Sequence, residues 1–95
     1  MTRITDSTTI VAAEDTLSTT LDGESVILHT GSGKYFGFNH VGTDIWELLE
    51  EPQSIEAVTQ RIADDYDVTR ERCRDDIDEL VAELIEKELV RVVDE

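Results

Sequence analysis

The hydrophobic period of this sequence changes within one stretch, Gly33-Lys34-Tyr35-Phe36-Gly37-Phe38-Asn39-His40-Val41-Gly42-Thr43-Asp44-Ile45-Trp46-Glu47-Leu48-Leu49. Large residues dominate residues 34–38, and the alternation of Phe36 with Phe38 predicts a strand. The apolar residues that follow have helical spacing: Val41, Ile45, Leu48 and Leu49. Asn39 stands at the change and is predicted to be the helix N-cap, because its side chain can accept a hydrogen bond from a free N–H of the first turn. A short strand therefore runs directly into a helix, and this junction fixes the angle between a sheet and a helical layer.

Two further strands are predicted upstream of this junction. Residues 16–21 are rich in β-forming residues that alternate, and residues 24–30 form a second such run. Asp22-Gly23 between them is a strong signal for a tight turn, and Gly31-Ser32-Gly33 predicts a second turn. Three strands joined by short turns form an antiparallel meander. Its third strand, at residues 34–38, lies at an edge with one side of its backbone free.

Three helices and a short strand are predicted downstream. The helices cover about Asn39 to Glu50, a segment after the cap Ser54, and about Arg70 to Lys87 after the cap Thr69. Residues 89–93 alternate as a short terminal strand does. The predicted fold class is α+β and winged-helix-like, a three-stranded antiparallel β-meander followed by a three-helix bundle. Residues 16–95 form one domain, and residues 1–15 are expected to be a flexible or loosely docked arm, with a short strand near Ile10 left open.

Composition and charge exclude several classes of function. The chain has 95 residues, of which 39% are hydrophobic, enough for one modest core. Its net charge of −15 argues against nucleic acid and against an anionic membrane surface as partners. No apolar run approaches the roughly 20 residues of a membrane helix, and the N-terminus lacks the pattern of a signal peptide. A cytoplasmic protein is expected. The acidity fits either a surface adapted to high salt or attraction for a peptide ligand.

Catalytic and metal-binding patterns are absent from the sequence. The many carboxylates form no recognisable acid/base arrangement, and those near Asp75 fan around a helix instead of converging. Cys73 falls on the apolar stripe of the third helix, which predicts a buried structural thiol. One cysteine and two histidines, His29 and His40, show no zinc-ligand spacing. No enzyme activity, cofactor or metal is therefore expected.

The junction also resembles a known family. The matching residues are Gly33, Tyr35, Phe38-Asn39, Gly42, Ile45-Trp46 and Leu48-Leu49. This pattern is similar to that of the PqqD-like proteins, the small leader-peptide recognition domains of pathways that modify ribosomally made peptides. The chain also resembles this family in length and element order from Thr16 to Val93.

The resemblance implies a binding site between the third strand and the third helix. In PqqD-like domains the leader segment of a precursor peptide adds to that strand as a further strand. Carried over by position, the strand wall is Lys34, Tyr35, Phe36, Gly37 and Phe38. The helix wall is Cys73, Arg74, Ile77, Asp78, Val81 and Leu84. Tyr35 and Ile77 are the favoured contacts, whereas core packing is left open for Phe38, Leu80 and Leu84.

The resulting hypothesis is a non-catalytic protein that binds a precursor leader peptide and presents it to modifying enzymes or a leader peptidase. Stand-alone relatives work with a cysteine-type peptidase and a cyclase in lasso-peptide pathways, and others serve a radical SAM enzyme; the sequence leaves this choice open. A winged-helix transcription regulator is an alternative, disfavoured by the acidic third helix, and a protein-binding scaffold is another. The expected oligomeric state is a monomer or a weak homodimer that pairs through the edge strand.

Overall fold

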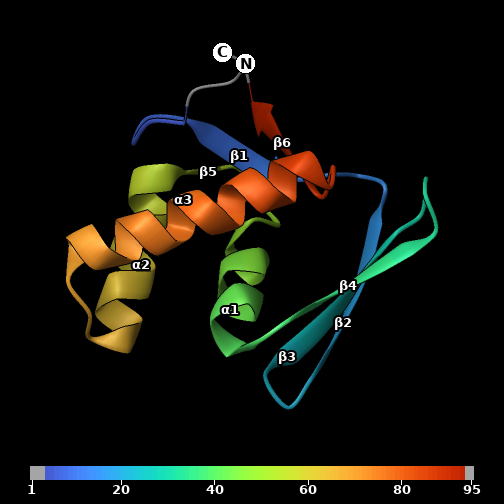
Figure 1. Ribbon diagram of the computed structural model, residues 1–95, viewed down its shortest axis with the longest axis horizontal. Coiled ribbons are helices and arrows are strands. Elements are labelled where there is room, and N and C mark those ends of the chain that lie inside the picture. The colour runs from blue at the N-terminus through green and yellow to red at the C-terminus, as the bar shows by residue number, and fades with distance from the viewer. Residues whose placement is uncertain (1–3, 94–95) are drawn as a thin grey trace.

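The computed structural model describes residues 4–93 of the chain (Figure 1). Its elements are β1 (Thr9–Ala12), β2 (Thr16–Leu21), β3 (Glu24–His29), β4 (Lys34–Phe38), α1 (His40–Leu48), β5 (Gln53–Ser54), α2 (Ile55–Tyr66), α3 (Arg70–Glu86) and β6 (Val90–Val93). The predicted α+β class is confirmed, with an antiparallel meander followed by three helices. No helix in the described part of the chain is long and apolar enough to cross a membrane.

The meander consists of β2, β3 and β4 in that spatial order. Asp22 and Gly23 connect β2 to β3 with φ values of 54° and 80°, as a two-residue turn with both central residues left-handed requires. β4 pairs with β3 from His29↔Lys34 to Ser25↔Phe38. Within residues 4–93, no strand pairs with the other side of β4, so the third strand of the meander is an edge, as expected.

The junction between β4 and α1 is held by local hydrogen bonds. The side chain of Asn39 accepts a bond of 3.0 Å from the Gly42 N–H, which confirms the predicted N-cap. Thr43 donates its hydroxyl to the Phe38 carbonyl at 3.4 Å and shares a buried hydrogen bond of 2.8 Å with the Ser25 hydroxyl. These contacts join α1 to both β3 and β4.

The N-terminal segment departs from the prediction. A flexible arm over residues 1–15 is wrong for residues 9–12, which form β1 in the centre of a second sheet of order β5-β1-β6. Ile10 in this strand is completely buried. Only two consecutive large apolar residues mark β1 in the sequence, and its partners lie more than 40 residues away, so no local period identified it. Residues 1–3 of the expected arm and residues 94–95 of the expected domain lie outside the described part.

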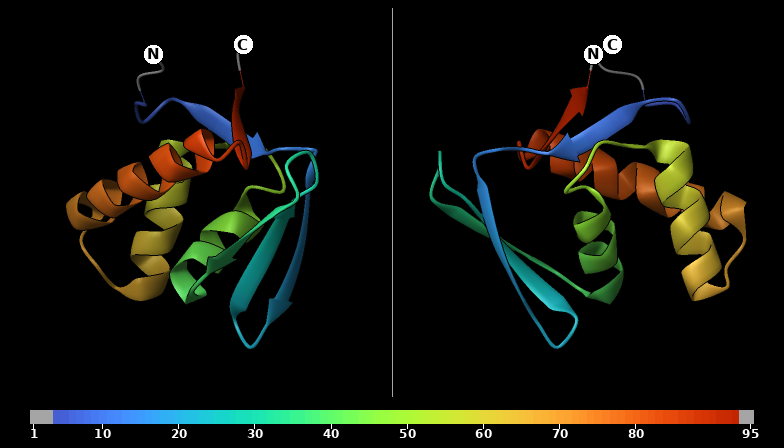
Figure 2. Two further views of the ribbon diagram at one scale, coloured as in Figure 1. Left: turned by 45° about the vertical axis from the view of Figure 1, so that its right-hand side comes forward. Right: turned by 180° about the vertical axis from the view of Figure 1, so that it is seen from behind.

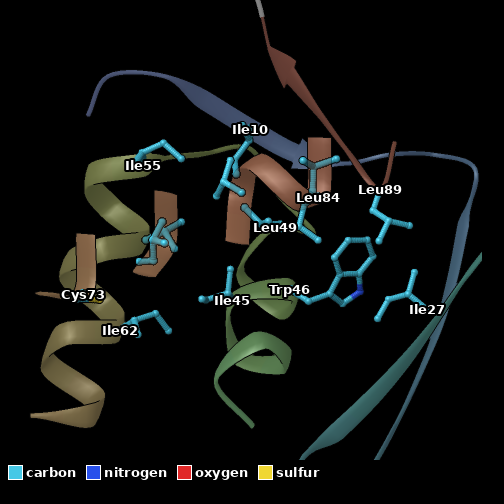
Figure 3. Close-up of a cluster of buried hydrophobic side chains, with 14 of the residues drawn as sticks. Ile10, Ile27, Ile45, Trp46, Leu49, Ile55, Ile62, Cys73, Leu84 and Leu89 are labelled. Carbon is cyan, nitrogen blue, oxygen red and sulfur yellow. The ribbon is translucent and has the colours of Figure 1, made fainter. Parts of the chain in front are cut away.

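The hydrophobic core lies between the helices and the two sheets (Figure 3). Trp46 extends from α1 toward Ile27 of β3, and its ring lies 6.3 Å from that of Phe38 between centroids. Cys73 is buried, as expected, and its thiol donates to the Thr59 carbonyl at 3.5 Å. Burial raises the pKa of the Cys73 thiol, which therefore stays protonated and unreactive near neutral pH. The core thus fixes α1 and α3 relative to β4.

Candidate functional site

A hollow opens directly beside the free edge of β4. It has a volume of about 410 Å³ and lies where the end of β4, the start of α1 and the middle of α3 meet. Its lining residues are Gly37, Phe38, Asn39, Val41, Gly42, Asp76 and Leu80. We call it the edge hollow. A Cβ on Gly42 would lie 3.0 Å from Cβ of Phe38, so glycine at this position keeps the strand close to the helix.

A second hollow continues from the first toward α2. It has a volume of about 270 Å³, and its lining is mostly apolar: Val41, Ile45, Ile62, Tyr66, Val68, Cys73, Asp76, Ile77 and Leu80. We call it the helix hollow. Val41, Asp76 and Leu80 line both hollows, so the two form one continuous groove that begins at β4 and ends between α2 and α3.

Two side-chain contacts join elements that surround the groove. The Lys87 ammonium, just after α3, lies 5.2 Å from the centroid of the Phe36 ring of β4. The Tyr66 hydroxyl, in the lining of the helix hollow, donates to the Asp44 carboxylate of α1. This bond to a carboxylate raises the pKa of Tyr66 to about 12, so the phenol remains neutral at physiological pH.

Asp76 is the charged residue that the two hollows share. No lysine or arginine of residues 4–93 forms an ion pair with it. Other acidic residues are paired, because Asp6 accepts from Arg74 at 2.7 Å and from Arg70 at 3.1 Å. The carboxylate of Asp76 therefore remains available to a positively charged group that enters the groove.

The five residues predicted for the strand wall occupy different places. Gly37 and Phe38 line the edge hollow, whereas Phe36 is half-buried beneath the Lys87 ammonium and lines neither hollow. Lys34 is exposed at the start of β4. Tyr35 lies on the opposite face of the sheet, beside Leu17, Val26 and Leu28, because successive residues of a strand point to opposite faces. The groove therefore meets the last two residues of β4, and Tyr35 does not line it.

The six residues predicted for the helix wall are also divided. Cys73 and Ile77 line the helix hollow, whereas Val81 and Leu84 are buried in the core. Arg74 and Asp78 pair with each other on another face of α3, where Arg74 also binds Asp6. None of these last four lines either hollow.

The wall of the groove on α3 also includes the neighbouring residues Asp76 and Leu80, which line both hollows. Sequence reasoning missed Asp76, the contribution of Val41 from α1, and Tyr66 and Val68 near the end of α2. Asp76 lies at the border of the apolar stripe of α3, and this position was the available sign of its role. The centre of the stripe packs into the core, so a surface groove is lined by the residues beside the stripe, where apolar and charged side chains meet.

The chemistry of this site is that of binding. A free strand edge offers main-chain donors and acceptors in register, and the adjoining hollows offer apolar walls with one carboxylate. Within residues 4–93, no three side chains of His, Cys, Asp or Glu converge where they would hold a metal ion. An extended peptide satisfies both the strand edge and the hollows at once.

Comparisons with known proteins agree with a peptide-binding site. The family model described as "Coenzyme PQQ synthesis protein D (PqqD)" matches residues 24–90. Among solved structures, "TbiB1 in Complex with the TbiA(beta) Leader Peptide" superposes with a TM-score of 0.81 at 33% sequence identity, covering 90% of this chain and 99% of that chain. A comparison with curated proteins gave no match.

Proposed function

The chain belongs to the PqqD family, and on that premise we propose that it is a non-catalytic recognition domain for the leader segment of a ribosomally made precursor peptide. The leader adds to β4 as a fourth strand of the meander, and its side chains enter the groove beside α3. The observation that carries this proposal is the free edge of β4 next to two connected hollows. The similarity to TbiB1, whose solved structure is a complex with a leader peptide, supports it.

Main-chain hydrogen bonds supply the part of the affinity that does not depend on sequence. In an antiparallel or parallel pair, every second residue of an edge strand directs its N–H and C=O outward, so the five residues of β4 engage a short guest segment. A strand of that length with two or three side-chain pockets is expected to bind with a Kd between about 1 nM and 1 µM.

Side chains in the groove supply the selectivity. The helix hollow accepts a large apolar side chain, since Ile45, Ile77 and Leu80 form much of its wall. Asp76 favours a lysine or arginine beside that apolar anchor, because its carboxylate is unpaired within residues 4–93. A leader with an apolar anchor and a nearby basic residue is therefore the expected ligand.

Presentation of the bound leader to a maturation enzyme completes the proposed role. The enzyme is either a leader peptidase acting with a cyclase or a radical SAM enzyme, and the genes beside the precursor distinguish these pathways. We place the protein in the cytoplasm, as a monomer when the leader occupies β4. A transcription regulator is disfavoured, because exposed Asp75, Glu79 and Glu83 would face the phosphates of nucleic acid with negative charge.

The direct test is titration of the chain with the leader of the precursor peptide encoded beside it, measured by calorimetry. Leu80→Ala should weaken binding about tenfold, because loss of an apolar interface side chain costs about 1–2 kcal/mol. Ile85→Ala is the matched control, since Ile85 packs partly buried on the same helix but lines neither hollow. Absence of binding by the unmodified chain, or equal effects of the two variants, would contradict the proposal.

A second titration tests whether the Asp76 carboxylate contributes to leader binding. Asp76→Asn and Asp75→Asn remove the same net charge, but only Asp76 lines the groove. For a leader that carries a basic residue, Asp76→Asn should weaken binding about two- to fivefold, as expected for a solvent-exposed ion pair, and Asp75→Asn should change it less. Equal losses of leader affinity in the two variants would show that only the net charge of the chain affects binding.

A further inference from the structure

The alternation of residues on β2 places apolar side chains on the solvent side of the meander. Leu17 and Leu21 are 65% and 75% exposed, and Thr19 lies between them. The residues on the opposite face of β2 are polar: Thr16, Ser18 and Thr20. Ser18 and Thr20 are exposed as well, so neither face of β2 is buried in the core, and its two leucines form an apolar row on one side of the strand.

The neighbouring strands extend this apolar surface. Leu17 pairs with Leu28 and Thr19 with Val26 across β2 and β3, and Leu28 pairs with Tyr35 across β3 and β4. Val26 is 46% and Tyr35 70% exposed. These side chains share one face of the sheet because paired residues point to the same side. We call it the outer face: Leu17, Thr19, Leu21, Glu24, Val26, Leu28 and Tyr35.

No described element covers the outer face. All three helices lie on the other side of the meander (Figure 2), where Ile27 and Ser25 of β3 are buried. Leu17, Val26, Leu28 and Tyr35 line a shallow hollow of about 190 Å³ on the outer face. Contiguous exposed apolar surface of this kind marks interaction sites on soluble proteins.

Charge and position indicate the kind of partner. Glu24 lies on the outer face, and Asp15 and Asp22 lie at the ends of β2. The start of β4 adds one exposed lysine, Lys34, so the charge of this rim is mainly acidic. A second copy of the chain, with a net charge of −15, would bring two acidic rims together. A partner with an apolar patch flanked by lysine or arginine complements the same surface.

The outer face is also continuous with the edge proposed to take the guest peptide. Tyr35 belongs to both, since it is part of β4 and points to the outer face. A strand added to β4 would extend this face and place every second guest side chain on it, one of them beside Tyr35. A protein docked on the outer face would therefore touch the guest as well.

We propose that the outer face docks the enzyme that acts on the bound peptide, through an apolar patch of that enzyme flanked by basic residues. This inference rests on the proposed leader recognition. The domain then has two separate surfaces: the groove selects the leader, and the outer face positions the enzyme next to it.

The experiment uses the full chain, its leader and the maturation enzyme encoded beside the precursor. Leader affinity is measured by calorimetry, and enzyme affinity for the chain–leader complex by biolayer interferometry. The test variant is Leu17→Thr/Leu21→Thr, which keeps β-forming residues at exposed positions. Thr20→Ser on the opposite face of β2 is the control, because Thr20 does not line the hollow of the outer face. Leu21→Thr alone is used if the double variant loses its circular dichroism spectrum.

The double variant is expected to bind leader as the unmodified chain does and to bind the enzyme at least tenfold more weakly. Glu24→Lys should also weaken enzyme binding, by about two- to fivefold for one rim charge. Enzyme binding that is absent, or unchanged by the variants, overturns the proposal. So does sedimentation of the unmodified chain as a dimer that Leu17→Thr/Leu21→Thr dissociates, since a second copy would then cover the face. Failure of leader binding alone refutes the proposed function, and enzyme binding to the free chain still tests the outer face.

Discussion

The buried hydroxyl pair that joins β3 to α1 should show strong thermodynamic coupling. The oxygens of Ser25 and Thr43 lie 2.8 Å apart, and the two residues are 2% and 1% exposed. Ser25→Ala leaves the Thr43 hydroxyl a second partner, the Phe38 carbonyl at 3.4 Å. Thr43→Val leaves the Ser25 hydroxyl with no partner among the hydrogen bonds of the described residues. The two substitutions are therefore expected to differ in cost.

The magnitudes follow from the cost of an unsatisfied buried group. Ser25→Ala should lower the free energy of unfolding by about 1 kcal/mol, the net value of one hydrogen bond. Thr43→Val should lower it by about 2 kcal/mol, because a buried hydroxyl then lacks a partner. In the double variant both hydroxyls are gone, so the total should be about 2 kcal/mol, which gives a coupling energy of about 1 kcal/mol.

Urea unfolding at one pH, followed by circular dichroism, measures this cycle. Thr59→Val combined with Ser25→Ala is the control pair, because Thr59 donates to Ile55 within its own helix and shares no partner with Ser25. Additivity of Ser25→Ala and Thr43→Val to within about 0.3 kcal/mol would refute the reasoning. The reasoning is also refuted if Ser25→Ala lowers the free energy of unfolding more than Thr43→Val does.

Three further predictions concern the junction and the N-terminal ion pair. Asn39→Ala should lower the free energy of unfolding by about 1 kcal/mol in thermal or urea unfolding, since the cap to the Gly42 N–H is lost. Gly42→Ala should destabilise by about 1 kcal/mol despite better helix propensity, because its Cβ would lie 3.0 Å from Cβ of Phe38. Arg74 and Arg70 hold the pKa of Asp6 below its ordinary value of 3.8, so its ionised form stabilises the fold at neutral pH. The melting temperature of Asp6→Asn should therefore be lower than that of the unmodified chain at neutral pH, and the difference should shrink as the pH falls below 3.8.

Each of these predictions has a result that contradicts it. Asn39→Asp should retain most of the cap, so equal losses for Asn39→Ala and Asn39→Asp would argue against the hydrogen bond as the cause. A more stable Gly42→Ala would mean that Phe38 moves aside at little cost. A difference between Asp6→Asn and the unmodified chain that grows toward low pH would have the wrong sign for a carboxylate with a lowered pKa.

Local sequence determines the parts of the fold that were predicted. The turn at Asp22-Gly23 and the caps at Asn39, Ser54 and Thr69 depend on residues within three positions of each other. Their chemistry is readable without knowledge of the tertiary structure. The helices that follow these caps consequently begin where the sequence placed them.

Features that depend on distant partners were left open or only partly predicted. β1 exists because β6 and β5 pair with it, and the sequence around Ile10 carries no sign of either partner. Of the helix residues predicted for the groove, Cys73 and Ile77 line it, whereas Val81 packs into the core. Asp76 and Leu80 complete the wall, because the centre of the apolar stripe marks the core and its border meets the groove. The alternation on β2 separates two faces, but it cannot say which of them lies on the side of the helices.

The antiparallel pairing of β1 with β6 brings Thr9 opposite Val93. The start of β1 and the end of β6 therefore lie side by side in the ribbon (Figure 1). Such geometry makes a circular permutant practicable: a glycine-rich linker joins the end of β6 to the segment that leads into β1, with new ends cut at the exposed turn around Ser32. It also means that the whole unit can be spliced into a loop of another polypeptide without stretching either connection.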